Sequence, residues 1–181
     1  MKNMKHPFKA YLLITVILTV LVAGCIAGCW TETESRWIIP EPMFYSEEDL
    51  KNLYFDHKDE FQEVVEIVLG SDSLLQHLKD TNDNDWGICT TDDARFFTKE
   101  DWEKIVAFSQ DVKFTMIMRS LEDGEDTVYF VFRRKRENGK QIGVHLYKVA
   151  NEKNLDSYSY ENDTFEEIDE NWWICFRVYP S

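Results

Sequence analysis

The spacing of apolar residues changes once along this chain, near Val112, and this change restricts the possible fold more than any other feature. Before it, apolar residues recur every three or four positions, as in a helix with one buried face. After it they alternate with other residues, as in a strand. Helices followed by strands favour an α+β fold, with the helices on one face of an antiparallel sheet.

The first predicted helix begins at Ser46, whose hydroxyl can accept a free backbone N–H and which acidic residues follow. Its apolar stripe runs from Leu50 to Val68 and includes His57, for which a hydrogen-bonded core histidine is the expected role. Gly70 is placed to end this helix.

Two further helices and a short strand are predicted before the change of period. The second helix covers residues 72–79, and a strand is expected at about 86–90. Thr98 repeats the capping pattern and begins a third helix, whose apolar residues run to Phe108.

Four longer strands follow, three of them joined as consecutive hairpins with an Asn138-Gly139 turn. They are expected at about 113–120, 126–135, 141–149 and 171–179. The predicted sheet therefore has four strands, with five as the alternative. The order of elements resembles that of cystatin-like and NTF2-like folds, which can hold a pocket between helix and sheet.

The N-terminal segment is typical of an export signal. Its first nine residues form a basic stretch with three lysines and no acidic residue, and an uncharged apolar run follows from Ala10 to Ala23. The run ends in Leu21-Val22-Ala23-Gly24-Cys25, which resembles the lipobox of bacterial lipoproteins. The resemblance covers only this leader. It implies that Cys25 is diacylated and becomes the new N-terminus, so that the domain is held at the outer face of the cytoplasmic membrane.

Two alternatives to Cys25 stay open. Cys29 ends a second lipobox-like match, although its use would stretch the apolar region beyond about 15 residues. An uncleaved anchor is the other, because the apolar stretch approaches the roughly 20 residues that span a bilayer. All three place the domain outside the cytoplasm. We expect a signal peptide at 1–24, an anchor site and tether at 25–45, and one α+β domain at 46–181.

The charge of the chain limits its partners. The 181 residues include 20 Lys and Arg against 34 Asp and Glu, and loss of residues 1–24, which hold three lysines and no acidic residue, changes the formal net charge from -14 to -17. Phosphate backbones repel so acidic a domain, so nucleic-acid binding is not expected. The expected partners are the membrane, through the N-terminal lipid, and a surface protein or a small ligand.

The face of the sheet turned away from the helices is the candidate binding surface. If Met116 and Met118 point to the helices, alternation places eight polar and aromatic residues on the other face. These are Arg119, Tyr129, Arg133, His145, Tyr147, Trp173, Arg177 and Tyr179. Such side chains suit an anionic or sugar-like ligand or a protein partner, and the alternative is cross-strand pairing on a solvated face.

A basic cluster, Arg133 to Arg136 with Lys140 across the turn, stands out in the acidic chain. It can contact anionic lipid headgroups, and the alternative is a charged hairpin tip that keeps the protein soluble. Cys89 and Cys175 can form a disulfide in an oxidising compartment or remain two separate thiols.

No catalytic motif is present, and no cofactor or metal is expected. Asp80, Asn82 and Asn84 resemble the start of a calcium loop, but the later ligands are missing and a solvated loop is favoured. The sequence favours a non-enzymatic interaction or ligand-binding module. The alternative is an enzyme or small-ligand carrier, with a pocket between helices and sheet lined by Trp86, Trp102 and the last strand.

Overall fold

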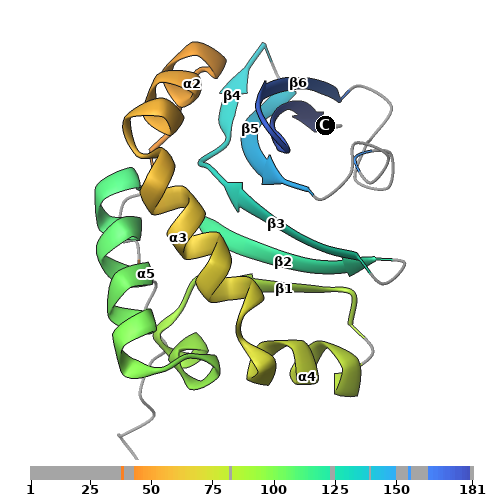
Figure 1. Cartoon of the computed structure of the whole chain (residues 1–181). Helices are drawn as coiled ribbons and strands as arrows, with labels where there is room; N and C mark the ends of the chain where they lie inside the picture. Colours follow the sequence, from red (N-terminus) through yellow and green to blue (C-terminus); the bar gives the residue numbers. More distant parts are fainter. Residues whose placement is uncertain are drawn as a thin grey trace, which may run out of the picture. The chain divides into compact units, whose positions relative to one another are not determined.

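The helices come before most of the strands, as the change of period predicts (Figure 1). The helical elements are α2 (Glu47–Asp56), α3 (Lys58–Leu69), α4 (Asp72–Thr81), the 3-10 turn η1 (Thr91–Phe96) and α5 (Lys99–Val112). The strands are β1 (Asp85–Ile88), β2 (Met116–Glu122), β3 (Glu125–Val131), β4 (Lys135–Glu137), β5 (Lys140–Lys148), β6 (Thr164–Asp169) and β7 (Trp172–Tyr179).

This computed structural model describes residues 38, 43–81, 83–122, 125–138, 140–149, 155 and 163–179. The predicted signal peptide, both candidate lipidation sites, Cys25 and Cys29, and Asn82 lie outside the described residues. Within the described ranges, no helix is both long enough and apolar enough to cross a membrane.

The sheet has seven antiparallel strands in the order β1-β2-β3-β5-β7-β6, with β4 paired to β5. The α+β class is therefore confirmed, but the predicted count of four or five strands is wrong. One predicted strand, 126–135, is broken at residues 132–134 into β3 and β4. Strand β6 was missed because Glu166 and Glu167 are exposed on this edge strand and interrupt the apolar alternation.

The sequence predicted one helix from Ser46 to Gly70, but the structure has two helices there, α2 and α3. At His57 the backbone leaves the helical region, with φ -123° and ψ 25°, and the chain turns from α2 into α3. Helix α2 packs against β5 and β7, whereas α3 packs against β3 and α5. The break lets the apolar stripe follow a curved sheet, which one straight helix of this length cannot do.

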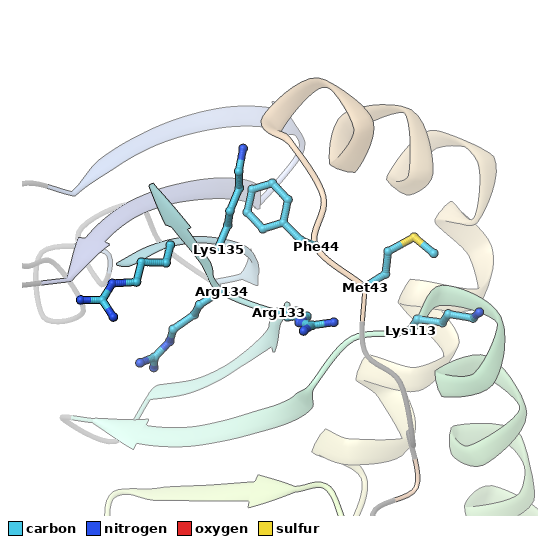
Figure 2. A pocket seen from close by; sticks show the side chains of 7 residues that line it. Met43, Phe44, Lys113, Arg133, Arg134 and Lys135 are labelled. Atoms are coloured by element: carbon cyan, nitrogen blue, oxygen red, sulfur yellow. The ribbon is translucent and has the colours of Figure 1, made fainter. Parts of the chain in front are cut away.

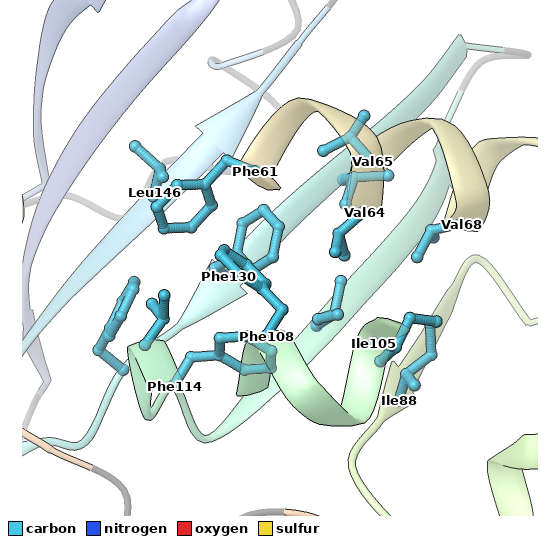
Figure 3. Close-up of a cluster of buried hydrophobic side chains, with 14 of the residues drawn as sticks. Phe61, Val64, Val65, Val68, Ile88, Ile105, Phe108, Phe114, Phe130 and Leu146 are labelled. Atoms are coloured by element: carbon cyan, nitrogen blue, oxygen red, sulfur yellow. The ribbon is translucent and has the colours of Figure 1, made fainter. Parts of the chain in front are cut away.

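An aromatic core fills the space between α3, α5 and the sheet (Figure 3). The ring of Phe61 on α3 lies edge-on to Phe108 of α5 at 4.8 Å and to Phe130 of β3 at 4.9 Å between centroids. Phe114 packs on Phe130 from the residues that lead into β2. Edge-to-face pairs of this kind add to the burial of apolar area and hold the helices on this face.

The predicted helix starts are confirmed. The Ser46 hydroxyl accepts the backbone N–H of Asp49, and the Thr98 hydroxyl accepts that of Asp101. Such caps are worth about 1 kcal/mol each. They fix the residues at which α2 and α5 begin.

Candidate functional site

The structure gathers six of the eight predicted face residues on the side of the sheet that is turned away from the helices. The register places Tyr129 beside Tyr147 and Tyr147 beside Trp173, and the two tyrosine rings stack with centroids 4.7 Å apart. The six are Tyr129, His145, Tyr147, Trp173, Arg177 and Tyr179, which we call the aromatic cluster. Their predicted placement on one face is thus met.

This face is less open to solvent than predicted, because two of the six residues are buried and the other four are half-buried. Tyr147 is 1% exposed and His145 2% exposed. Tyr147 packs with Val149, Leu155 and Cys175 into a second apolar cluster. Alternation along a strand shows which residues share a face, but not whether another segment covers it.

Arg119 lies on the helix side of the sheet, which corrects its predicted place. Its side chain is 1% exposed, Nη1 donates to the carbonyls of Val68 and Ser71, and the guanidinium pairs with Asp126. Phe114 and Ile117 are both in the core although they are three positions apart. In a regular strand, residues an odd number of positions apart would point to opposite faces.

A bend at Thr115, before β2 begins, takes up the extra position. The shift turns Met116 and Met118 toward Gly87 on the other face, where sequence alternation had not placed them.

Charged and polar groups lie inside the aromatic cluster. Arg177 pairs with the carboxylate of Asp163 at 2.7 Å and donates to the Tyr147 hydroxyl at 3.4 Å. His145 Nε2 lies 2.8 Å from the Tyr179 hydroxyl, and its Nδ1 has no hydrogen-bond partner in the part of the chain that is described. Burial, and then the positive charges of Arg177 and Arg134, lower the pKa of His145 to about 3. The imidazole is therefore neutral at physiological pH.

Beside this cluster lies a groove of about 520 Å³ that five cationic and two apolar side chains line (Figure 2). Its lining residues are Met43, Phe44, Lys113, Arg133, Arg134, Lys135 and Arg136. We call it the basic groove. Arg133, the seventh of the predicted face residues, lies here and not in the aromatic cluster.

Three separate segments build the basic groove, and backbone hydrogen bonds hold them together. The N–H of Met43 donates to the carbonyl of Lys113 at 2.9 Å, and the N–H of Arg133 donates to the carbonyl of Met43 at 3.2 Å. Lys113 ends α5 in the left-handed conformation, with φ 56°, which turns the chain away from the helix axis. Arg133 and Arg134 lie in the break between β3 and β4, outside the ladder of the sheet.

One cation of the groove, Arg134, stacks on an aromatic ring of the aromatic cluster. The guanidinium carbon of Arg134 lies 3.6 Å from the centre of the Tyr179 ring. Gly143 makes room for this stack, because a Cβ there would approach the Tyr179 ring and His145 Nε2 to 3.1 Å. Stacking leaves the N–H edges of a guanidinium available to bind an anion. The basic groove and the aromatic cluster therefore meet at Tyr179.

Comparison with protein families, curated proteins and solved structures finds no match for this chain. Its function has to be argued from the site alone.

The chemistry of the groove is that of an anion site. Five cations border one hollow, and Lys135 Nζ also lies 5.5 Å from the centre of the Phe44 ring. Among the described residues no three His, Cys, Asp or Glu side chains are placed to hold a metal ion. Arginine binds carboxylate and phosphate oxygens in pairs, whereas lysine acts as a point charge.

The sequence identified only part of this groove. The run Arg133 to Arg136 was singled out, but Lys140 pairs with Glu137 in the ladder and is not among the lining residues. Met43, Phe44 and Lys113 carried no signal, because an isolated lysine and two apolar residues in a linker are unremarkable until folding brings them together.

The two thiols of the described region lie apart. Cys89 follows β1 and Cys175 is in β7, with three strands between β1 and β7, and both are free. The suggested disulfide is therefore not formed.

The aromatic residues suggested for a helix–sheet pocket are also packed separately. Trp86 packs on Phe96 and donates to Asp93, whereas Trp102 stacks on Phe97.

Proposed function

We propose that this protein is an extracytoplasmic module, held at the outer face of the cytoplasmic membrane by a lipid on Cys25, which binds an anionic ligand in the basic groove without catalysing a reaction. One observation carries the proposal of ligand binding: five cationic side chains from two segments line one groove in a chain with 34 acidic and 20 basic residues.

The negative charge of the rest of the domain restricts anion binding to this groove. A domain with so many carboxylates repels anions over most of its surface, so the cations must act locally. Charges separated by more than about 8 Å are largely screened at physiological salt. Arg134 is the side chain best prepared to bind, because its stack on Tyr179 reduces the freedom that it would lose on binding.

The membrane attachment rests on the lipobox that ends at Cys25, with Cys29 and an uncleaved anchor as alternatives. Mass spectrometry of the N-terminal peptide distinguishes the three. We expect a peptide that begins at a diacylated Cys25. A peptide that retains residues 1–24 without lipid contradicts this part of the proposal.

Pyrophosphate is a suitable probe of the groove, titrated calorimetrically into the full chain in a neutral detergent. We expect saturable binding that the double variant Lys135→Ala/Arg136→Ala weakens about tenfold, since each exposed charge pair is worth up to roughly 1 kcal/mol. The double variant Lys79→Ala/Lys99→Ala removes the same charge from α4 and α5 and serves as the control. Equal weakening by the two double variants would refute a specific anion site.

The finer architecture also remains a proposal. A cystatin-like or NTF2-like arrangement is supported by the order of the elements, with α2, α3 and α4 ahead of the hairpins of the sheet. An experimental structure of this chain in which β2, β3, β5 and β7 and the place of α3 follow either arrangement would establish it, and a different order of these strands would refute it.

A further inference from the structure

We infer that the anionic ligand of the basic groove is the phosphate-bearing headgroup layer of an anionic bilayer, the membrane that carries the chain, so that the groove is the membrane-facing side of the domain. This inference rests on the proposed anion-binding function and adds the identity of the ligand. It is carried by the mixture of side chains in the groove, by the residues that bring the chain into the domain, and by the charge of the groove.

The groove combines cations with two apolar side chains, one exposed and one half-buried. Met43 is 45% exposed, and Phe44 beside it has Lys135 Nζ 5.5 Å from its ring centre (Figure 2). A site for a small soluble anion needs the cations but not these apolar groups. At a bilayer surface the two kinds act together, because apolar side chains enter the headgroup boundary while lysine and arginine contact phosphates.

The groove lies where β2 begins and β3 ends, beside the segment by which the chain enters the domain. Ile38 is buried and donates its N–H to the carbonyl of Cys89 at 2.9 Å, and Met43 follows five positions later. Cys89 comes directly after β1, whose last residue, Ile88, is opposite Ile117 near the start of β2. The carbonyl of Lys113, which binds Met43, precedes that same end of β2.

A lipid on Cys25 would limit how far the domain can lie from the membrane. Thirteen positions separate Cys25 from Ile38, and covalent geometry limits their span to about 45 Å. An anchor at Cys29 shortens it further. The tether would therefore raise the local concentration of headgroups around the whole domain, and binding in the groove needs no strong intrinsic affinity.

The acidic residues of the domain oppose this contact. Burial, and then the charges of Asp111 and Asp49, raise the pKa of the hydroxyl of Tyr45, the residue after Phe44. These two carboxylates therefore lie near the segment that carries Met43 and Phe44. More distant carboxylates are screened at physiological salt. The contact should therefore weaken steeply as salt is raised.

Lysine footprinting of the full chain tests the inference. The protein is reconstituted into vesicles of phosphatidylcholine alone or with 30% phosphatidylglycerol, and an amine-acylating reagent is added. In the anionic vesicles we expect Lys113 and Lys135 to react at least about fivefold more slowly, as one surface cation already contributes about that factor. Lys79 and Lys99, on α4 and at the far end of α5, should react equally in both vesicles.

Two further measurements complete the test. The variant Arg133→Ala/Arg136→Ala leaves the reporting lysines in place and should reduce their protection, and high salt should remove it. Equal labelling of Lys113 and Lys135 in the two kinds of vesicle would overturn the inference, and so would an equal slowing of Lys79 and Lys99.

Pyrophosphate in neutral detergent separates this inference from the proposed function. If pyrophosphate protects Lys113 and Lys135 but anionic vesicles do not, the groove binds soluble anions and only the membrane contact is wrong. If neither protects them, both proposals fail.

Discussion

Replacement of Arg119 should clearly lower the free energy of unfolding. Its guanidinium is buried between β2 and the end of α3, where Nη1 donates to the carbonyls of Val68 and Ser71 at 2.9 and 3.1 Å. Nε and Nη2 bind the two carboxylate oxygens of Asp126, each at 3.0 Å. The variant Arg119→Met keeps an unbranched apolar stem but removes all four hydrogen bonds and the charge.

The expected loss follows from what remains behind. Breaking a buried ion pair by removal of one partner costs about 3–5 kcal/mol. The Asp126 side chain is 32% exposed, so water can solvate it after the change. The carbonyl of Ser71 still accepts from the N–H of Leu75 at 3.1 Å, and that of Val68 from Ser71 at 3.4 Å. We therefore expect the lower end, about 3 kcal/mol, or a fall in Tm of roughly 10 °C.

Urea unfolding followed by tryptophan fluorescence measures this loss. Lys99→Met is the control, because Lys99 is 90% exposed and its replacement should change the free energy of unfolding by less than about 0.5 kcal/mol. In a double-mutant cycle with Asp126→Asn, we expect a coupling energy of about 1–3 kcal/mol. A loss below about 1 kcal/mol for Arg119→Met would show that the buried guanidinium does not hold α3 to the sheet.

Two further predictions concern titratable groups. Hydrogen bonds from Lys58, from the Tyr54 hydroxyl and from the backbone of Glu170 lower the pKa of Asp169 from 3.8 to about 2. Because the pKa is lower in the folded state, this contribution to stability is present above about pH 4 and is lost as the pH falls toward 2. Asp169→Asn should therefore lose less stability than the wild type between pH 6 and pH 2.5 in urea unfolding, and an unchanged pH dependence contradicts this. Burial raises the pKa of Cys89 to about 11 and of Cys175 to about 12, so iodoacetamide at pH 8 should label both peptides slowly in the native protein and rapidly in urea. Rapid native labelling, or a disulfide-linked peptide, contradicts the second prediction.

The proposed anchor and the charge of the domain have opposite effects at a membrane. A lipid on Cys25 would hold the chain at a membrane, whereas the net charge of the domain opposes contact with an anionic surface. The basic groove is the place where both conditions can be met, because five cations border one hollow of this acidic domain. Footprinting of the lysines in that groove is the most informative experiment for this protein.

Features that depend on neighbouring residues were predictable from the sequence. Ser46 and Thr98 cap helices because each hydroxyl binds a backbone N–H only three positions away. Val128, Phe130 and Phe132 face the core together because successive residues of an extended chain alternate in direction. These interactions hardly depend on the rest of the chain, so the class of the fold followed from them.

Tertiary contacts decided the rest. One extra position at Thr115 reversed the direction of Arg119, and the carbonyls of Val68 and Ser71 gave that charge a buried place that no local pattern indicates. His57 ends α2 because the stripe must follow a curved sheet. The basic groove depends on Met43, Lys113 and Arg133 being joined by two backbone hydrogen bonds. Contacts between residues 20 to 90 positions apart are governed by packing of the whole domain, and such packing leaves no periodic signal in the sequence.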